Sequence, residues 1–375
     1  MRTLVDYRPA LRTRTGVGEY VHELSRALVA TAGPGDSLLL FSSSRSDRLA
    51  PGVVPGATVI DRRWPVRLLN YAWHRWERPA IESFVDRSHG PIDVAQSMHP
   101  LLMPARTAAQ VITIHDLDFL AHPERTTGEI RRDYGTLAKS HAARADRIVA
   151  VSEYTAGEIV RQLGVSRDRI TIASPGAPDW QPRDREPANG YVLFLGTLEP
   201  RKNLGVLLDA YAALVSQGAP APKLVIAGRA AHGSEEWIAR ANSAPLAGRV
   251  ELRGYVAPED RRALMAGAAA LVMPSLMEGF GIPVVEAMTL GVPVIASDRG
   301  SLPEVLGGAG EIFAATDSAA LMAALSRVMG SSDLRARMTQ AGLERAKNYT
   351  WTGTARNTRD AWAEAAIARK ARRHD

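Results

Sequence analysis

Two glutamates stand in a segment of the chain that is otherwise almost entirely apolar. The segment from Met277 to Ser297, MEGFGIPVVEAMTLGVPVIAS, carries Glu278 and Glu286. Burying a carboxylate is costly unless another group pairs with it, so both residues are candidates for a binding site. Acidic residues bind ribose hydroxyls in nucleotide sites, and we therefore expect a hydroxyl-bearing ligand. The alternative for Glu286, an ordinary exposed helix position, fits poorly with its apolar neighbours.

Two cations follow a different apolar run. Arg201 and Lys202 come just after YVLFLG and before a helical pattern. Two positive side chains between a strand and a helix could hold a diphosphate. Ordinary solvated loop charges are the alternative, but the position directly after an expected strand favours binding. We expect Glu199 to pair with these cations and not to react.

Glycines mark two loops where the backbone could approach a ligand. Gly279 and Gly281 flank Phe280 directly after Glu278, and Gly16 and Gly18 open a helical pattern near the N-terminus. Backbone amides at such helix starts are suited to anions. A G-x-G pair is weak on its own, and a turn that needs positive φ is the alternative for the N-terminal pair.

A histidine and two aspartates follow the apolar run VITI. His115 could orient a substrate hydroxyl, with Asp116 beside it, or it could be a loop histidine next to a helix-capping aspartate. Asp116 and Asp118 form D-x-D, which is too little for a metal site. We expect no protein-bound metal here.

The elements that must position these residues alternate regularly. Apolar runs such as RTLVD, SLLLFSS, QVITIHD, YVLFLG and AALVMPS are separated by helical patterns. This rhythm predicts βαβ units and parallel sheets. Ligands of such sheets bind beyond the carboxyl ends of the strands, which is where most of the candidate residues lie.

A proline-rich break, SPGAPDWQPRDREPANG, divides the chain into two α/β halves. We predict an N-terminal domain over 1–175, a linker over 176–190 and a C-terminal domain over 191–355. A helix at about 356–375 is expected to pack back on the first domain. The predicted fold class is α/β, with two Rossmann-like parallel-sheet domains facing a cleft and a helical C-terminus.

Length and composition exclude several classes of protein. The 375 residues suit two domains, and 46 Lys and Arg against 40 Asp and Glu give a net charge of +6. No basic stripe interleaved with aromatic residues points to nucleic acid. The lack of cysteine excludes disulfides, thiolate metal sites and thiol nucleophiles. With no signal peptide and no apolar run near the ~20 residues of a membrane span, we expect a cytoplasmic protein.

Together these motifs resemble those of the retaining glycosyltransferases of family 4, which have the GT-B fold. The most specific part is PSLMEGFGIPVVEAMTLGVPVIASDRGSLPEV, in which seven residues separate Glu278 from Glu286. The segments FLGTLEPRKNL, LRGYV and TIHDL follow in the family's arrangement, and Gly16 and Gly18 match its N-terminal loop. The resemblance covers nearly the whole chain and is weaker in the N-terminal half.

This resemblance implies that the second domain binds a nucleotide-sugar donor, which is a substrate, so that no cofactor is required. Arg201 and Lys202 would hold its diphosphate, Glu286 its ribose and Glu278 its hexose. The remaining contacts would come from the amides of Gly279, Phe280 and Gly281, from Tyr255 and Val256 near the base, from Gly16 and Gly18 near the phosphates, and from His115 facing the sugar. Those closest to the reacting atoms would be His115, Glu278, Arg201 and Lys202.

The resemblance also implies transfer of a hexose with retention, in which the departing diphosphate can take the acceptor proton. No metal is then required, because cations fixed at the phosphate stabilise the departing charge. The segment TIHDLDFLAHPE resembles mannosyltransferases of bacterial surface polysaccharide and lipopolysaccharide synthesis. GDP-mannose is then the expected donor, and a glycan or lipid-linked saccharide the expected acceptor. A GT-B nucleotide-sugar epimerase and a non-catalytic nucleotide-sugar-binding subunit are the alternatives.

One segment bears on the location of the protein. RRWPVRLLNYAWHRWERP places Trp64, Trp73 and Trp76 among several arginines. Arginine and tryptophan on one helix can dock at the anionic inner face of a cell membrane. A core helix with aromatic packing is the alternative. The sequence leaves the oligomeric state undetermined.

Overall fold

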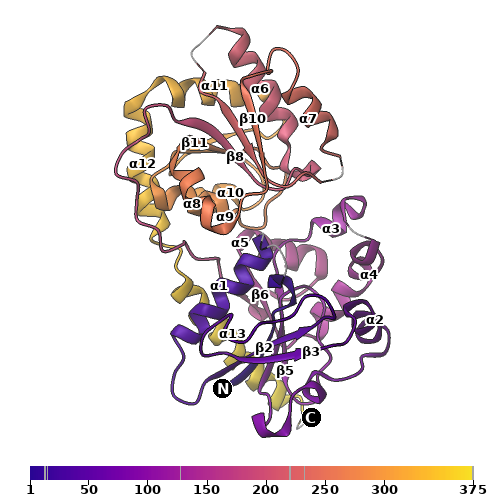
Figure 1. The fold of residues 1–375 in the computed structure, drawn as a ribbon. Coiled ribbons are helices and arrows are strands. Elements are labelled where there is room, and N and C mark those ends of the chain that lie inside the picture. The colour runs from indigo at the N-terminus through magenta and orange to yellow at the C-terminus, as the bar shows by residue number, and fades with distance from the viewer. Residues whose placement is uncertain (12–13, 15, 127, 219–220, 232, 374–375) are drawn as a thin grey trace. The chain divides into compact units, whose positions relative to one another are not determined.

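The computed structural model describes residues 1–11, 14, 16–126, 128–218, 221–231 and 233–373. The chain forms two compact units, shown in Figure 1. The first contains Met1–Gly176 and Thr350–Asp375, and the second contains Ala177–Tyr349. Each unit is built on one parallel β-sheet with helices packed on it.

The first unit has a seven-stranded sheet in the order β3-β2-β1-β4-β5-β6-β7. Its strands are β1 (Arg2–Asp6), β2 (Ser37–Ser43), β3 (Thr58–Arg62), β4 (Val94–Ser97), β5 (Ala109–Ile114), β6 (Arg147–Ala150) and β7 (Ile170–Ile172). Its α-helices are α1 (Gly16–Ala30), α2 (Val66–Trp76), α3 (Asp118–Ala121), α4 (Gly128–Arg144), α5 (Glu153–Glu158) and α13 (Trp351–Ala371).

The second unit has a six-stranded sheet in the order β10-β9-β8-β11-β12-β13. Its strands are β8 (Tyr191–Leu195), β9 (Leu224–Ala227), β10 (Val250–Gly254), β11 (Ala268–Met273), β12 (Val294–Ser297) and β13 (Glu311–Phe313). Its α-helices are α6 (Leu204–Ser216), α7 (Glu235–Ala241), α8 (Pro258–Ala266), α9 (Ile282–Leu290), α10 (Leu302–Leu306), α11 (Ser318–Gly330) and α12 (Ser332–Ala346).

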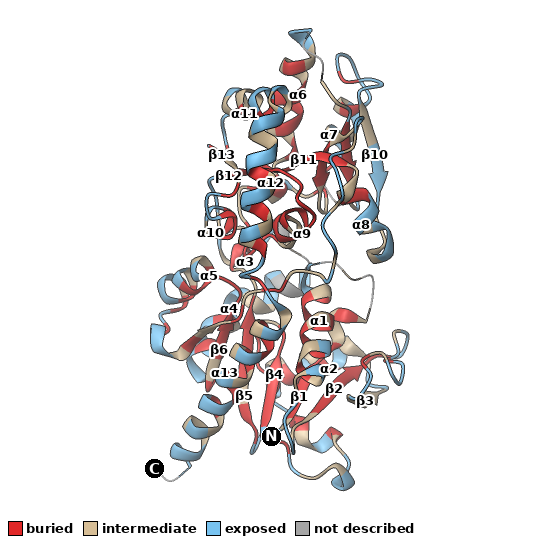
Figure 2. Cartoon of the chain, turned by 90° about the vertical axis from the view of Figure 1, so that its left-hand side faces the viewer, coloured by how far each residue is buried: buried red, intermediate tan, exposed pale blue. Residues whose placement is uncertain are grey.

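The inner strands are buried on both faces, as Figure 2 shows. Parallel sheets covered on both sides need continuous apolar strands, which is why these runs stood out in the sequence. The edge strand β3, with the sequence TVIDR, was not predicted. Only its central residue, Ile60, is buried, so the strand lacks the apolar run that marks the inner ones.

The last helix, α13, belongs to the first unit. It contacts β4, β5, β6 and β7 as well as α1. The Thr350 hydroxyl caps its start by accepting a hydrogen bond from the Gly353 amide at 3.1 Å. The helix therefore begins at Trp351, earlier than the position of about 356 that we predicted. On its buried face, Trp362 Nε1 donates to Gln96 Oε1 of β4.

The residues that we predicted as a linker, 176–190, lie almost entirely in the second unit. The backbone amide of Arg183 donates to the Leu290 carbonyl at 3.2 Å, and its side chain donates to the Ala268 carbonyl at 2.6 Å. These contacts fasten an irregular segment to the sheet that follows it. None of the described helices is long and apolar enough to cross a membrane.

Candidate active site

The loops after β8 and β11 lie next to each other, because these strands are neighbours in the second sheet. The loop after β8 carries Arg201 and Lys202 in a short turn, η7 (Pro200–Lys202). The loop after β11 carries Glu278. Lys202 Nζ donates to Glu278 Oε1 at 2.5 Å, and Arg201 Nη1 lies 3.4 Å from Oε2. The structure thus brings three of the predicted site residues into one cluster.

This cluster is buried. Lys202 is 9% exposed and Glu278 is 6% exposed. Burial acts to raise the pKa of the Glu278 carboxyl, but the charges of Lys202 and Arg201 outweigh it and hold the pKa below its ordinary value. Ser275 Oγ adds a hydrogen bond to Glu278 Oε1 at 2.7 Å. As we predicted, Glu199 pairs with a cation, Arg201 Nε, at 2.7 Å.

The backbone around Glu278 is held from two sides. The Leu276 amide donates to the Arg201 carbonyl at 2.8 Å, which ties the two loops together. Gly300 has a φ of +62°, and a Cβ there would lie 2.4 Å from the Glu278 carbonyl oxygen. Only glycine fits this close approach, so the Glu278 loop depends on residue 300. Ser301 completes the contact by donating its amide to the same carbonyl at 3.0 Å.

Glu286 is buried in α9 at 3% exposure, which makes the alternative of an exposed helix residue wrong. Arg261 Nη1, from α8, donates to Glu286 Oε1 at 2.7 Å. Sequence reasoning missed Arg261, because nothing in the chain indicates that α8 and α9 present these two residues to each other. The ion pair offsets the charge of the buried carboxylate through Oε1, as the apolar setting required.

The remaining candidates of the second unit have different surroundings. Gly281 has a φ of +94° and stands directly before α9, so its backbone conformation favours glycine. The Phe280 side chain is buried against Tyr349, with ring centroids 5.4 Å apart. Tyr255, after the edge strand β10, is 40% exposed, and the Arg229 guanidinium lies 5.7 Å from its ring centroid. Val256 beside it is partly buried.

In the first unit, Gly16 and Gly18 begin α1. Both lie in the helix without positive φ, so the alternative of a turn that needs positive φ is wrong. A Cβ on Gly18 would lie 2.8 Å from the Pro9 carbonyl oxygen, whereas one on Gly16 would have open space. Gly18 is thus needed for close packing within the unit, and only Gly16 faces space that a ligand could use.

His115 follows β5 directly. Its ring packs edge-on against Tyr20, with centroids 5.0 Å apart. Burial lowers the pKa of His115 to about 4, so the imidazole is neutral at neutral pH. Among the described residues, the buried Nε2 atom has no hydrogen-bond partner. A neutral ring with one unsatisfied nitrogen is suited to a ligand hydroxyl. Asp116 Oδ1 accepts from the Asp118 amide at 3.2 Å, a local turn contact.

Two further polar groups lie at the same sheet edge, and sequence reasoning missed both. Asp6, the last residue of β1, is fully buried and is bound by Arg8, with Nη2 2.7 Å from Oδ2. His99, after β4, has Nε2 3.3 Å from the same oxygen. Burial acts to raise the pKa of Asp6, but Arg8 and His99 keep it well below its usual range. Strands β1, β4 and β5 are consecutive in the sheet, so Asp6, His99 and His115 share one edge.

Both halves of the chain match sequence models of glycosyltransferases. The sequence model described as "Glycosyltransferase Family 4" matches residues 14–179, and the one described as "Glycosyl transferases group 1" matches residues 181–345. The chain belongs to glycosyltransferase family 4. The two matches meet near residue 180, close to where the structure separates its two units.

Individual relatives of this glycosyltransferase are bacterial enzymes. It is 29% identical over 391 aligned positions to the O-antigen chain mannosyltransferase B of Escherichia coli, covering 96% of this chain and 99% of that protein. It is 31% identical over 250 positions to the MMP alpha-(1->4)-mannosyltransferase of Mycolicibacterium hassiacum, covering 64% of this chain and 60% of that protein.

The solved structure of sucrose-phosphate synthase from Thermosynechococcus elongatus matches with a TM-score of 0.75 at 18% identity, covering 96% of this chain and 97% of that chain. At this identity the match shows the fold alone. The glycosyltransferase has the predicted GT-B fold, with two Rossmann-like parallel-sheet units and a helical C-terminus.

Proposed function

We propose that this glycosyltransferase moves a mannosyl group from GDP-mannose to a hydroxyl of a glycan or lipid-linked saccharide during surface polysaccharide synthesis. The observation that carries the proposal is the cluster of Arg201 with the buried Lys202 and Glu278 at the carboxyl ends of β8 and β11. Two relatives bear the name mannosyltransferase, which supports mannose as the sugar.

Each residue of the cluster has a part in binding the donor. Arg201 and Lys202 hold the diphosphate, and Glu278 accepts hydrogen bonds from the hexose hydroxyls. Before the donor binds, Glu278 neutralises Lys202 at 2.5 Å. When the negatively charged diphosphate binds, Arg201 and Lys202 interact with both the phosphates and the buried Glu278 carboxylate. Glu286, oriented by Arg261 at 2.7 Å, is the ribose ligand.

The proposed reaction breaks the bond between the anomeric carbon and the phosphate oxygen. The acceptor oxygen bonds to that carbon on the same face, and the acceptor proton passes to a phosphate oxygen. Negative charge builds on the departing diphosphate, where Arg201 and Lys202 stabilise it without a metal ion. His115 binds a hydroxyl group through its unsatisfied Nε2.

The donor is tested by thermal stabilisation with GDP, UDP, ADP and their sugars, in the presence and absence of Mg²⁺. A ligand that binds the folded state raises the melting temperature by mass action. We expect a shift that is selective for GDP, does not require Mg²⁺ and is lost in Glu286→Ala. The matched control is Glu259→Ala, which changes an exposed glutamate of α8. A UDP-selective shift would exclude GDP-mannose as the donor. The absence of any shift would contradict the assignment of the donor site.

The stereochemistry of transfer is tested by NMR of the first product formed. Retention predicts the same anomeric configuration in product and donor, and an inverted product would contradict the proposed step. Donor turnover without an acceptor, with formation of an epimeric nucleotide sugar, would instead support an epimerase.

We also propose peripheral contact with an anionic membrane through the outward face of α2. The core-helix alternative describes Trp73, which is 2% exposed, whereas the exposure of Leu68 and Trp76, 63% and 64%, supports the proposed contact. Exposed arginines at 63, 67 and 75 accompany this apolar face. Arg62, which we grouped with them, is committed to the Phe84 carbonyl at 2.8 Å and to Asp86.

Flotation with vesicles of phosphatidylcholine and phosphatidylglycerol tests this contact. Leu68→Ser/Tyr71→Ser should weaken flotation, whereas Val160→Ser/Ile367→Ser, which changes exposed apolar residues elsewhere in the first unit, should not. Equal flotation of the two variants would count against the α2 surface.

A further inference from the structure

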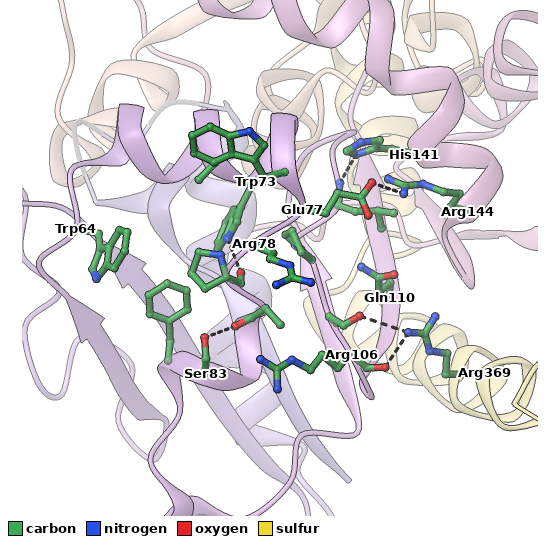
Figure 3. Close-up of a pocket in the computed structure, with 18 of the residues that line it drawn as sticks. Trp64, Trp73, Glu77, Arg78, Ser83, Arg106, Gln110, His141, Arg144 and Arg369 are labelled. Carbon is green, nitrogen blue, oxygen red and sulfur yellow. Dashed lines mark hydrogen bonds and ion pairs between the residues drawn. The ribbon is translucent and has the colours of Figure 1, made fainter.

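A cavity of about 1510 Å³ lies in the first unit, and His115, Gly16 and Gly18, the residues of this unit assigned to the reaction, are not among those that line it (Figure 3). It is lined by the end of α2, the segment before β5, the end of α4 and the end of α13. Arg106 precedes β5 and Arg144 precedes β6, so the part of the cavity that these two residues line is at the amino ends of β5 and β6. His115 and Asp6 lie at the opposite, carboxyl edge, where family 4 chemistry is expected.

The cavity is strongly cationic. Its lining includes six arginines, at positions 62, 78, 106, 144, 369 and 372, and a single carboxylate, Glu77. His141 adds no positive charge at neutral pH, because burial lowers its pKa to about 4. Its Nδ1 accepts a hydrogen bond from the Leu102 amide at 2.9 Å. Guanidinium groups gathered around one space repel one another, and a bound anion would offset that repulsion.

Four of these arginines are held by the protein. Arg144 pairs with Glu77, Arg62 with Asp86 at 3.1 Å, and Arg372 with Asp146 at 3.2 Å. Arg369 donates to the carbonyls of Ala105 and Arg106 at 3.4 and 3.3 Å, as Figure 3 shows. These contacts fix the wall of the cavity, and the three ion pairs offset the charge of Arg62, Arg144 and Arg372.

The other two arginines, Arg78 and Arg106, have exposed side chains with no hydrogen bond or ion pair to any residue that the structure describes. They come from different segments and line the same space. Two unpaired guanidinium groups in one cavity form a natural site for a phosphate, which accepts paired N–H bonds from each.

Three tryptophans also line the cavity. Trp73 is buried, whereas Trp64 and Trp76 are 48% and 64% exposed. Indole rings beside arginines suit a ligand that joins an anionic group to an apolar or planar one. The volume is also far larger than inorganic phosphate requires.

We propose that this cavity binds a phosphate ester through Arg78 and Arg106, at a site separate from the one that binds the donor. The ester could belong to an anionic lipid headgroup or to a soluble phosphorylated compound, since both present the same group. Nothing in the proposed transfer reaction uses this site, so its occupancy is independent of the reaction chemistry.

The test compares Arg78→Gln/Arg106→Gln with Arg45→Gln/Arg87→Gln, which removes the same charge from exposed arginines of the first unit outside the cavity. The probes are inorganic pyrophosphate, measured by calorimetry, and phosphatidylcholine vesicles containing phosphatidylglycerol, measured by flotation. Ionic strength is matched with NaCl. The donor site is intact in both variants, so any binding there contributes equally.

We expect the affinity for at least one probe to fall about tenfold in Arg78→Gln/Arg106→Gln and to stay at the wild-type value in the control. A tenfold fall corresponds to roughly 1.4 kcal/mol of binding free energy, which one charged contact provides. A loss with pyrophosphate indicates a soluble ligand, and a loss confined to vesicles indicates a lipid headgroup. Equal behaviour of the two variants with both probes would overturn the proposal. Because the side chains of Arg78 and Arg106 have no partner among the described residues, the variant should fold like the control, which equal melting temperatures would verify.

Discussion

Both units pair a buried carboxylate with a cation, Asp6 with Arg8 in the first and Glu278 with Lys202 in the second, but the first unit also holds three histidines that burial keeps neutral. In the second unit, Lys202 and Glu278 are both charged and compensate each other at 2.5 Å. In the first unit, His22, His115 and His141 are kept neutral, because burial lowers each pKa to about 4. Charge pairing depends on a partner, whereas neutralisation depends on pH. We therefore expect the second unit to lose stability when a charged partner is removed, and the first unit to lose stability when the pH falls.

Removing the partner in the second unit should have the largest effect. Lys202→Met leaves Glu278 as a buried carboxylate with Ser275 and a more distant Arg201. We expect the free energy of unfolding to fall by about 3–5 kcal/mol, measured by urea denaturation. Lys223→Met, at an exposed position of the same unit, should change it by less than about 0.5 kcal/mol.

A double variant sharpens this result. Adding Glu278→Gln to Lys202→Met removes the buried charge and should restore part of the lost stability. If Lys202→Met alone were as stable as Lys223→Met, the view that charge pairing stabilises the second unit would be wrong.

Mild acid should act on the first unit. Each of the three histidines has a native pKa near 4 and an unfolded value near 6.5, so the unfolded chain binds more protons between these pH values. The free energy of unfolding should fall by roughly 1–2 kcal/mol per histidine as the pH drops from 7 to 5. The stabilisation from Glu278, whose pKa is lowered, is lost only below about pH 4.5.

Hydrogen exchange read by mass spectrometry separates the two units. Between pH 7 and 5, once intrinsic exchange rates are corrected, protection should fall in β4, β5 and β6 and stay constant in β8 and β11. Equal loss in both sheets would contradict the histidine explanation. In His22→Gln/His141→Gln, the pH dependence of the first unit should be reduced.

The fold was largely predictable because the inner strands of both sheets are continuous apolar runs. The contacts within the site were not. Lys202 and Glu278 are 76 residues apart, and only the adjacency of β8 and β11 brings them together. The Arg261–Glu286 pair likewise depends on how α8 meets α9. Asp6 and His99 could have been predicted as site residues from the sequence. Asp6 ends an apolar run and His99 follows one, which is also the position of the site residues that we did predict.

The glycines at the start of α1 provide a smaller contrast within the first unit. Gly18→Ala should cost about 1–3 kcal/mol, because its Cβ would overlap the Pro9 carbonyl. Gly16→Ala has open space and should leave the free energy of unfolding unchanged or raise it by up to ~1 kcal/mol. Thermal denaturation measures both. If the backbone at 16 approaches the donor phosphates, Gly16→Ala should also weaken donor binding, and unchanged affinity would remove that role.

The smallest effect should come from a neutral pair of the first unit. The Tyr7 hydroxyl and His22 Nδ1 lie 2.6 Å apart in the core. Tyr7→Phe removes this hydrogen bond but introduces no buried charge, so we expect a loss of about 1 kcal/mol in urea denaturation. Tyr71→Phe, at an exposed position, is the control. A loss as large as that of Lys202→Met would erase the distinction between the two units.

The return of the chain to its first unit through α13 has a consequence for biosynthesis. A ribosome releases residues 1–176 long before the helix that covers β4 to β7. The second unit, by contrast, is continuous and is complete by Tyr349. The unit that is synthesised first is thus the last to be completed. Until α13 is made, the Gln96 side chain and its face of the sheet lack the contact with Trp362. Translation that stops short of α13 would release a protein with a completed second half and an uncovered, aggregation-prone first half.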